Sequence, residues 1–156
     1  MTQLAELPGA LIEPMLHAVK SAARWSGWQP RSNHAGHQIG VAELVDAAGI
    51  TMPGLTVQLE IKAPVVAVSC FYLFSIMKLA GRERRPVYQL EVVPGGKRSH
   101  NGPLPLYGPH EHVGALEPVG ITHPSVNCDD WNGCLSWFFT RTSIVPFDLT
   151  NPLVLQ

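Results

Sequence analysis

Residues 55–62 read Leu55-Thr56-Val57-Gln58-Leu59-Glu60-Ile61-Lys62, with an apolar side chain at every second position. Successive side chains of a β-strand point to opposite faces of a sheet, so this alternation predicts a strand with one buried and one polar face. A sheet with one buried face is therefore the expected framework of the chain.

Segments on both sides of residues 55–62 also have the character of strands. Strands are expected at residues 39–47, 65–79 and 87–93, and turns at residues 50–54 and 81–85. The Pro-Gly pair in the first turn suits the central positions of a type II turn. Residues 65–79 are apolar on both faces, as in a central strand. Because the links are short, neighbouring strands are expected to pair antiparallel as a meander.

Two helices are expected outside the meander. Residues 14–24 place apolar side chains at helical spacing. Asn127 is expected to cap a second helix that carries Asp129 and Asp130 in its first turn. A wide apolar stripe follows, formed by Trp131, Cys134, Leu135, Phe138 and Phe139. The 156 residues thus predict one α+β domain, 1–156: an antiparallel β-meander with an N-terminal helix and a C-terminal helix packed on one face.

The chain contains few charged residues. Charged residues make up 15% of the chain, against about 25% in an average soluble domain. This favours a covered face, and hence a partner or a homo-oligomer. The net charge of −1 gives no overall attraction to nucleic acid, but six basic residues against two acidic ones lie between Lys78 and Arg98. These cations suit either a phosphate-binding rim or an exposed sheet edge.

The sequence indicates a cytoplasmic protein. An odd number of cysteines (Cys70, Cys128 and Cys134) and the absence of a signal peptide predict buried free thiols in a reducing compartment. The longest apolar run, residues 63–77, would span about 22 Å as a helix, short of the ~30 Å hydrocarbon core of a bilayer. No membrane association is expected.

Histidines gather in residues 100–114, a segment that prolines and glycines interrupt. His110 and His112 are expected to lie on an extended backbone, with both imidazoles on one face and Glu111 on the other. His100 is expected to join them from the end of the preceding strand. The sequence leaves open the roles of three further histidines: His34, His37 and His123.

Acid–base catalysis without a cofactor is the leading interpretation of this cluster, because imidazoles titrate near neutral pH and can serve as both base and acid in RNA cleavage. The expected acid–base groups are His100, His110 and His112, and the expected substrate-binding residues are Lys97, Arg98 and Tyr107. The cations would hold phosphate, and the tyrosine would stack on a base or hydrogen-bond a phosphate.

Two other interpretations of the same residues remain. In the first, His110, His112 and Glu117 hold a divalent metal such as zinc. In the second, the histidines are structural and bond backbone carbonyls. The sequence does not determine the substrate, or whether the protein is an enzyme.

Residues 87–94, 100–102 and 108–114 resemble, in that order, the strand, the H-N motif and the P-H-x-H motif of TumE-type toxins and related proteins of mobile elements. Residues 130–144 are similar to the closing helix of that group, so the likeness runs over residues 80–145. Gln89 and Glu91 stand where members of the group usually carry an arginine and an aspartate.

The resemblance implies a toxin–antitoxin setting, with a cognate antitoxin as partner. Together with the histidine cluster, it leads to the hypothesis of a toxin-like cytoplasmic protein that acts on nucleic acid, as a metal-independent ribonuclease. The alternative is a non-enzymatic metal- or partner-binding module of a mobile element.

Overall fold

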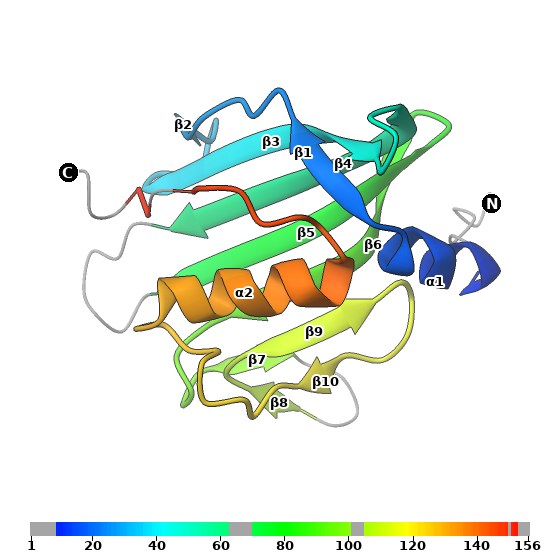
Figure 1. Cartoon of the computed structure of the whole chain (residues 1–156). Coiled ribbons are helices and arrows are strands. Elements are labelled where there is room, and N and C mark those ends of the chain that lie inside the picture. Colours follow the sequence, from blue (N-terminus) through cyan, green and yellow to red (C-terminus); the bar gives the residue numbers. More distant parts are fainter. Residues whose placement is uncertain (1–8, 63–69, 101–104, 150, 153–156) are drawn as a thin grey trace.

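The computed structural model describes residues 9–62, 70–100, 105–149 and 151–152 (Figure 1). Its centre is an antiparallel sheet, and helix α2 lies across one face of that sheet. The helices are α1 (Gly9–His17) and α2 (Trp131–Thr142). The α+β class predicted from the sequence is confirmed.

Four long strands form the middle of the sheet as a meander: β3 (His37–Asp46), β4 (Thr51–Lys62), β5 (Phe71–Ala80) and β6 (Glu83–Val92). Short strands extend it at both edges: β1 (Lys20–Ala23), β2 (Gln29–Pro30), β9 (His110–Val113) and β10 (Val119–Gly120). The strand order is β1-β3-β4-β5-β6-β9-β10, and β2 pairs with β3. Strands β7 (Arg98–His100) and β8 (Leu106–Tyr107) make a separate small sheet.

The alternation in residues 55–62 builds β4 as predicted. Its apolar side chains are 0–3% exposed and belong to the hydrophobic core: Leu55, Val57, Leu59 and Ile61. The core also takes the buried stripe of α2, in which Phe138 lies with its ring centroid 5.7 Å from that of Phe74 and 6.0 Å from that of Tyr88. Helix α1 contributes Ile12 and Leu16 to the same core.

The N-terminal helix is displaced from its predicted position. It ends at His17, and residues 20–23, which were expected to be helical, form strand β1 along the edge of β3. Small residues such as Ser21, Ala22 and Ala23 suit either conformation, and pairing with an available strand decides between them. The prediction of a helix over residues 14–24 is therefore wrong in its second half.

Three other boundaries also differ. The turn between β3 and β4 lies at residues 46–50, where Asp46 Oδ1 accepts hydrogen bonds from the amides of Ala48 and Ile50, and β4 already begins at Thr51. The link between β5 and β6 is shorter than predicted, because Ala80 pairs with Glu83. Strand β5 begins at Phe71, and residues 63–69, the start of the predicted central strand, lie outside the described residues.

The predicted cap of α2 is also wrong by three residues. Asp130 is the N-cap, and its Oδ1 accepts a hydrogen bond from the amide of Gly133 at 2.7 Å. Asn127 instead closes the preceding turn, because its Oδ1 accepts from the amide of Asp129 at 2.8 Å. Both acidic residues therefore precede the helix.

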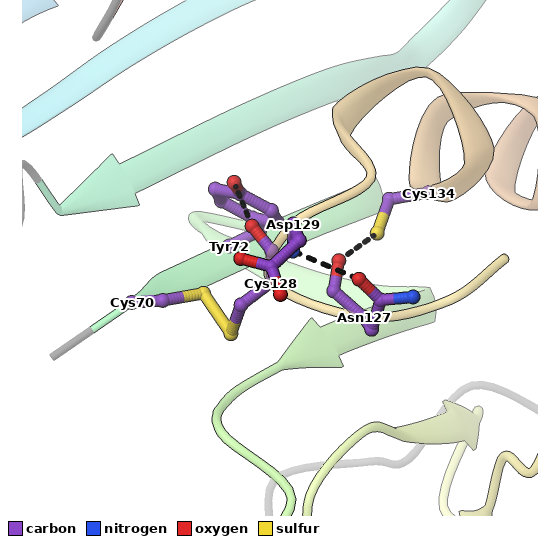
Figure 2. The surroundings of a disulfide bond; sticks show 6 residues. All are labelled: Cys70, Tyr72, Asn127, Cys128, Asp129 and Cys134. Atoms are coloured by element: carbon purple, nitrogen blue, oxygen red, sulfur yellow. Dashed lines mark hydrogen bonds between the residues drawn. A yellow bond between two sulfur atoms is a disulfide. The ribbon is translucent and has the colours of Figure 1, made fainter. Parts of the chain in front are cut away.

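Two of the three cysteines are not free thiols, contrary to the prediction. Cys70, directly before β5, forms a disulfide with Cys128 in the loop that leads to α2 (Figure 2). The Tyr72 hydroxyl donates a hydrogen bond to the Cys128 carbonyl at 3.0 Å. Cys134 is free and buried, and burial raises the pKa of its thiol to about 11. The cysteine count therefore no longer supports a reducing compartment.

Within the described residues, neither helix has the length and apolar character needed to cross a bilayer.

Lys20 is fully buried where the two helices and β1 meet. Its ammonium donates hydrogen bonds to the carbonyls of Leu16 at 3.0 Å, Ala18 at 2.6 Å and Thr142. These carbonyls belong to or follow the last turns of α1 and α2, where the helix dipole favours a cation. Lys20 therefore joins the carboxyl ends of both helices.

The stability of the protein is expected to rise between pH 8 and pH 10.5 because of Lys20. Burial lowers the pKa of Lys20 from 10.5 to about 8, so between these values the unfolded chain binds more protons than the folded protein. Urea denaturation of the wild type and of Lys20→Met across this range measures the effect. The variant should lack this part of the rise, whereas Lys97→Met, at an exposed position, should retain it. Parallel curves for wild type and Lys20→Met would contradict the assignment.

Candidate functional site

The sheet face opposite α2 carries a band of polar side chains, and we call it the open face because no described helix lies on it. Two rows of side chains, aligned by strand register, cross it. The rows are Ile39, Glu60, Leu73, Glu91 and His110, and Val41, Gln58, Ser75, Gln89 and His112. On β4, β5 and β6 the side chains of these rows alternate with core residues. The predicted imidazole pair therefore lies at the β9 end of two rows in which most side chains are polar.

His110 and His112 meet as the H-x-H pattern predicts. Their Nε2 atoms are 3.0 Å apart, and their ring centroids are 4.9 Å apart. His110 is only 1% exposed, whereas His112 is half-buried. The Nε2 atom of His110 also lies 3.4 Å from a carboxylate oxygen of Glu91. The site is thus a carboxylate and two imidazoles, of which His112 is the more accessible imidazole.

The hydrogen bond between the two rings needs one N–H and one lone pair, so it persists only while at least one ring is neutral. The Nδ1 atom of His110 faces the Gly108 carbonyl at 3.4 Å and donates to it. In the neutral ring this makes the His110 Nε2 an acceptor for the N–H of His112. When His110 is protonated, its own Nε2–H donates instead, toward Glu91 or toward His112. The arrangement can therefore hold a proton at either ring.

The small β7–β8 sheet leads directly into this pair through Gly108 and Pro109, and it lies beside β9 and β10 (Figure 1). The Ser99 hydroxyl donates to the carbonyl of Gly108 at 2.9 Å, the same carbonyl that His110 faces. Gly108 has a φ of +73°, and a Cβ there would lie 3.1 Å from the Gly95 Cα, so a side chain would be strained in this tight connection. The hairpin and the imidazole pair are therefore one local unit.

The predicted substrate-binding residues lie on this hairpin. Arg98 and Tyr107 are cross-strand partners, and both side chains are exposed. Lys97 is exposed in the turn before β7, with its amide bonded to the Pro94 carbonyl. The backbone of His100 belongs to β7 and pairs with Leu106, but its imidazole lies outside the described part of the structure.

The residues of the metal interpretation are not grouped. Glu117 is exposed in the loop between β9 and β10. Among the side chains that the structure describes, no three from His, Cys, Asp and Glu lie close enough to hold a metal ion. Within the described residues, Glu117 is therefore not grouped with His110 and His112.

Glu111 points to the opposite face, as the alternation predicts, and contacts α2. Its Oε2 accepts a hydrogen bond from the Tyr88 hydroxyl at 2.6 Å. Its two oxygens also face Arg141 of α2, at 3.2 Å from Nε and 3.3 Å from Nη2. Burial, and the Glu111 carboxylate beside it, raise the pKa of Tyr88 far above its ordinary value, so the phenol stays protonated and donates.

The other histidines lie elsewhere. His34 and His37 are near the β3 edge, four strand spacings or roughly 19 Å from β9. His123 lies on the helix side, where its ring packs against Trp137 at 5.6 Å and its Nδ1 accepts from the Ser125 amide. None of the three joins the His110–His112 pair.

Sequence reasoning missed a second polar cluster on the open face. Glu60, only 2% exposed, is held by Arg31 at 2.6 Å and by His37 Nδ1 at 2.7 Å. In the sequence Glu60 is an ordinary polar position of an alternating strand. Its partners come from the β2–β3 hairpin, about twenty-five residues away, and no local sequence pattern predicts them.

Comparison with known proteins gives no relative for this chain: no family model, no curated protein and no solved structure matches it.

Proposed function

We propose that the protein acts on single-stranded nucleic acid, RNA most directly, and that His112 exchanges protons with the substrate. The observation that carries the proposal is the half-buried imidazole of His112, hydrogen-bonded to the buried His110 beside an exposed basic hairpin. Cleavage of RNA at a 2′-hydroxyl needs proton transfer to and from oxygen, and imidazole performs both transfers near neutral pH.

The roles of the two imidazoles differ in this proposal. His110 is too buried to touch a substrate, so it acts through His112 by holding that ring and sharing a proton with it. A carboxylate oxygen of Glu91 lies 3.4 Å from the His110 Nε2 and can accept its N–H. His100, the third imidazole of the predicted set, remains a predicted acid–base group.

Substrate binding is assigned to the hairpin. Lys97 and Arg98 supply cations for phosphate, and the exposed ring of Tyr107 offers a stacking surface for a base. Aromatic stacking tolerates any base, so this surface suits recognition of an unpaired strand without sequence preference.

The resemblance to TumE-type toxins supports a toxin-like role with a cognate antitoxin as partner, and RNA as target favours the cytoplasm as the place of action. The Cys70–Cys128 bond weighs against that location, because disulfides persist mainly in oxidising compartments. Thiol counting on protein taken directly from the cytoplasm of its host tests whether the disulfide exists in that compartment. A bonded pair there would show that the disulfide is compatible with a cytoplasmic location.

His112→Ala is expected to slow cleavage of a single-stranded RNA oligonucleotide about 100-fold in the presence of a chelator, since it removes one acid–base group. Binding of the oligonucleotide should change little. Arg98→Ala should instead weaken binding, more so at low salt.

His123→Ala, on the other side of the sheet, is the matched control and should cleave as the wild type does. Cleavage by His112→Ala at the wild-type rate would contradict the acid–base role. Absence of both binding and cleavage in the wild type would contradict the nucleic-acid function itself.

A non-enzymatic partner-binding module is the second candidate function. Tyr107, Leu116 and Val119 are 57–70% exposed, and they lie on or between the short strands at this edge of the sheet. Exposed apolar groups that gather in one region indicate a contact surface. This candidate predicts a dimer or larger assembly by light scattering, together with no turnover of RNA.

A further inference from the structure

Glu111 lies between the two histidines in sequence but on the other face of β9. It is the point at which that strand is joined to α2. Its carboxylate receives the Tyr88 hydroxyl and the Arg141 guanidinium, and the Trp137 indole N–H donates to the same Tyr88 oxygen at 3.2 Å. The Arg141 guanidinium carbon also lies 5.7 Å from the centre of the Tyr88 ring. Four side chains from β6, β9 and α2 thus converge below the imidazole pair.

Strand β9 needs such an anchor because its backbone pairing is short. It has four residues, paired on one side with β6 and on the other, at only two positions, with β10. A glycine at position 114, with a φ of +54°, follows the strand at once. Backbone pairing sets the register of β9 along β6, but with only two pairs on the β10 side the tilt of the strand also depends on its side-chain contacts.

Because β9 is a pleated strand, a movement of Glu111 also moves His110 and His112 on the opposite face. Adjacent residues of a strand point to opposite faces, so a rotation of β9 about its axis moves the two imidazoles together. A slip by one residue would turn them toward α2 and bring Glu111 to the open face. The 3.0 Å contact between the two Nε2 atoms depends on that orientation.

We propose that Glu111 is a positioning residue, which uses Tyr88 and Arg141 to hold β9 so that His110 and His112 form their hydrogen bond on the open face. Its catalytic relevance rests on the proposed function, but the positioning itself does not. Helix α2, which lies on the other face of the sheet, thereby sets the geometry of that pair through the sheet.

The test is nuclear magnetic resonance on protein with ¹⁵N-labelled histidine. An N–H···N hydrogen bond transmits a scalar coupling between the two Nε2 atoms, and the wild type should show it. Glu111→Gln should lose the coupling because a neutral amide cannot replace the ion pair with Arg141. Tyr88→Phe, which removes only the hydroxyl, should weaken it, and provides a milder second variant should Glu111→Gln fold poorly.

Glu117→Gln changes an exposed carboxylate on the loop after the same strand and should leave the coupling unchanged. An undiminished coupling in both Glu111→Gln and Tyr88→Phe would overturn the proposal. Because the readout needs no RNA, a wild type that shows the coupling but cleaves no RNA would refute the proposed function and leave the positioning role standing.

Discussion

Reduction of the Cys70–Cys128 disulfide is expected to lower the free energy of unfolding by roughly 4 kcal/mol. The bond closes a loop of 58 residues, and removing it restores to the unfolded chain the entropy that loop closure had taken away. The same bond ties the start of β5 to the loop before α2, where Tyr72 holds the Cys128 carbonyl (Figure 2). Reduction of the disulfide therefore lowers stability mainly through its effect on the unfolded state.

Urea denaturation with and without a reducing agent measures this loss. The matched control is the pair Cys70→Ser and Cys128→Ser, which should be as unstable as the reduced wild type and should not respond to the reducing agent. Thiol counting on denatured protein should find one free cysteine before reduction and three after it. A wild type whose denaturation midpoint is the same in both conditions would contradict the stabilising role of the bond.

Phe138→Ala is expected to cost 3–5 kcal/mol, about the range found for truncating a buried phenylalanine. The Phe138 side chain is 0% exposed and lies at the centre of the contact between α2 and the sheet. Its ring meets Phe74 of β5 at 5.7 Å and Tyr88 of β6 at 6.0 Å. The space left by the ring cannot close fully, because the strands on one side and the helix backbone on the other are fixed.

The loss is measured by urea denaturation under oxidising conditions, so that the disulfide is kept. Ser136→Ala, on the exposed side of the same helix, is the control and should change stability by less than about 0.5 kcal/mol. A cost below 1 kcal/mol for Phe138→Ala would mean that α2 is not held on the sheet by this contact.

The H-x-H pair shows how far a local pattern reaches. The alternation of side chains along an extended backbone is enough to place His110 and His112 on one face and Glu111 on the other. It does not tell that His110 is 1% exposed and His112 half-buried, because burial depends on the hairpin and on Glu91 of the neighbouring strand. The division of roles between the two rings is therefore a tertiary result.

The differences in the rest of the fold have the same origin. Residues 20–23 have no strong preference of their own, and the free edge of β3 makes them a strand. Glu60 belongs to the polar phase of an alternating strand, and only Arg31 and His37 from another hairpin make it a buried charge. The pairing of Cys70 with Cys128 joins positions that no spacing rule connects.

Local sequence patterns are enough to predict the α+β class, the core face of β4, the apolar stripe of α2 and the shared face of the two imidazoles. Each of these follows from the period of a strand or of a helix, which is a property of the local backbone. The disulfide, the burial of Lys20 and the anchoring of β9 by Glu111, Tyr88 and Arg141 arise only when separate elements pack together. The disulfide, the bond from Lys20 to Thr142 and the bond from Tyr88 to Glu111 join residues 23 to 122 positions apart, and only the packing of separate elements brings them within bonding distance.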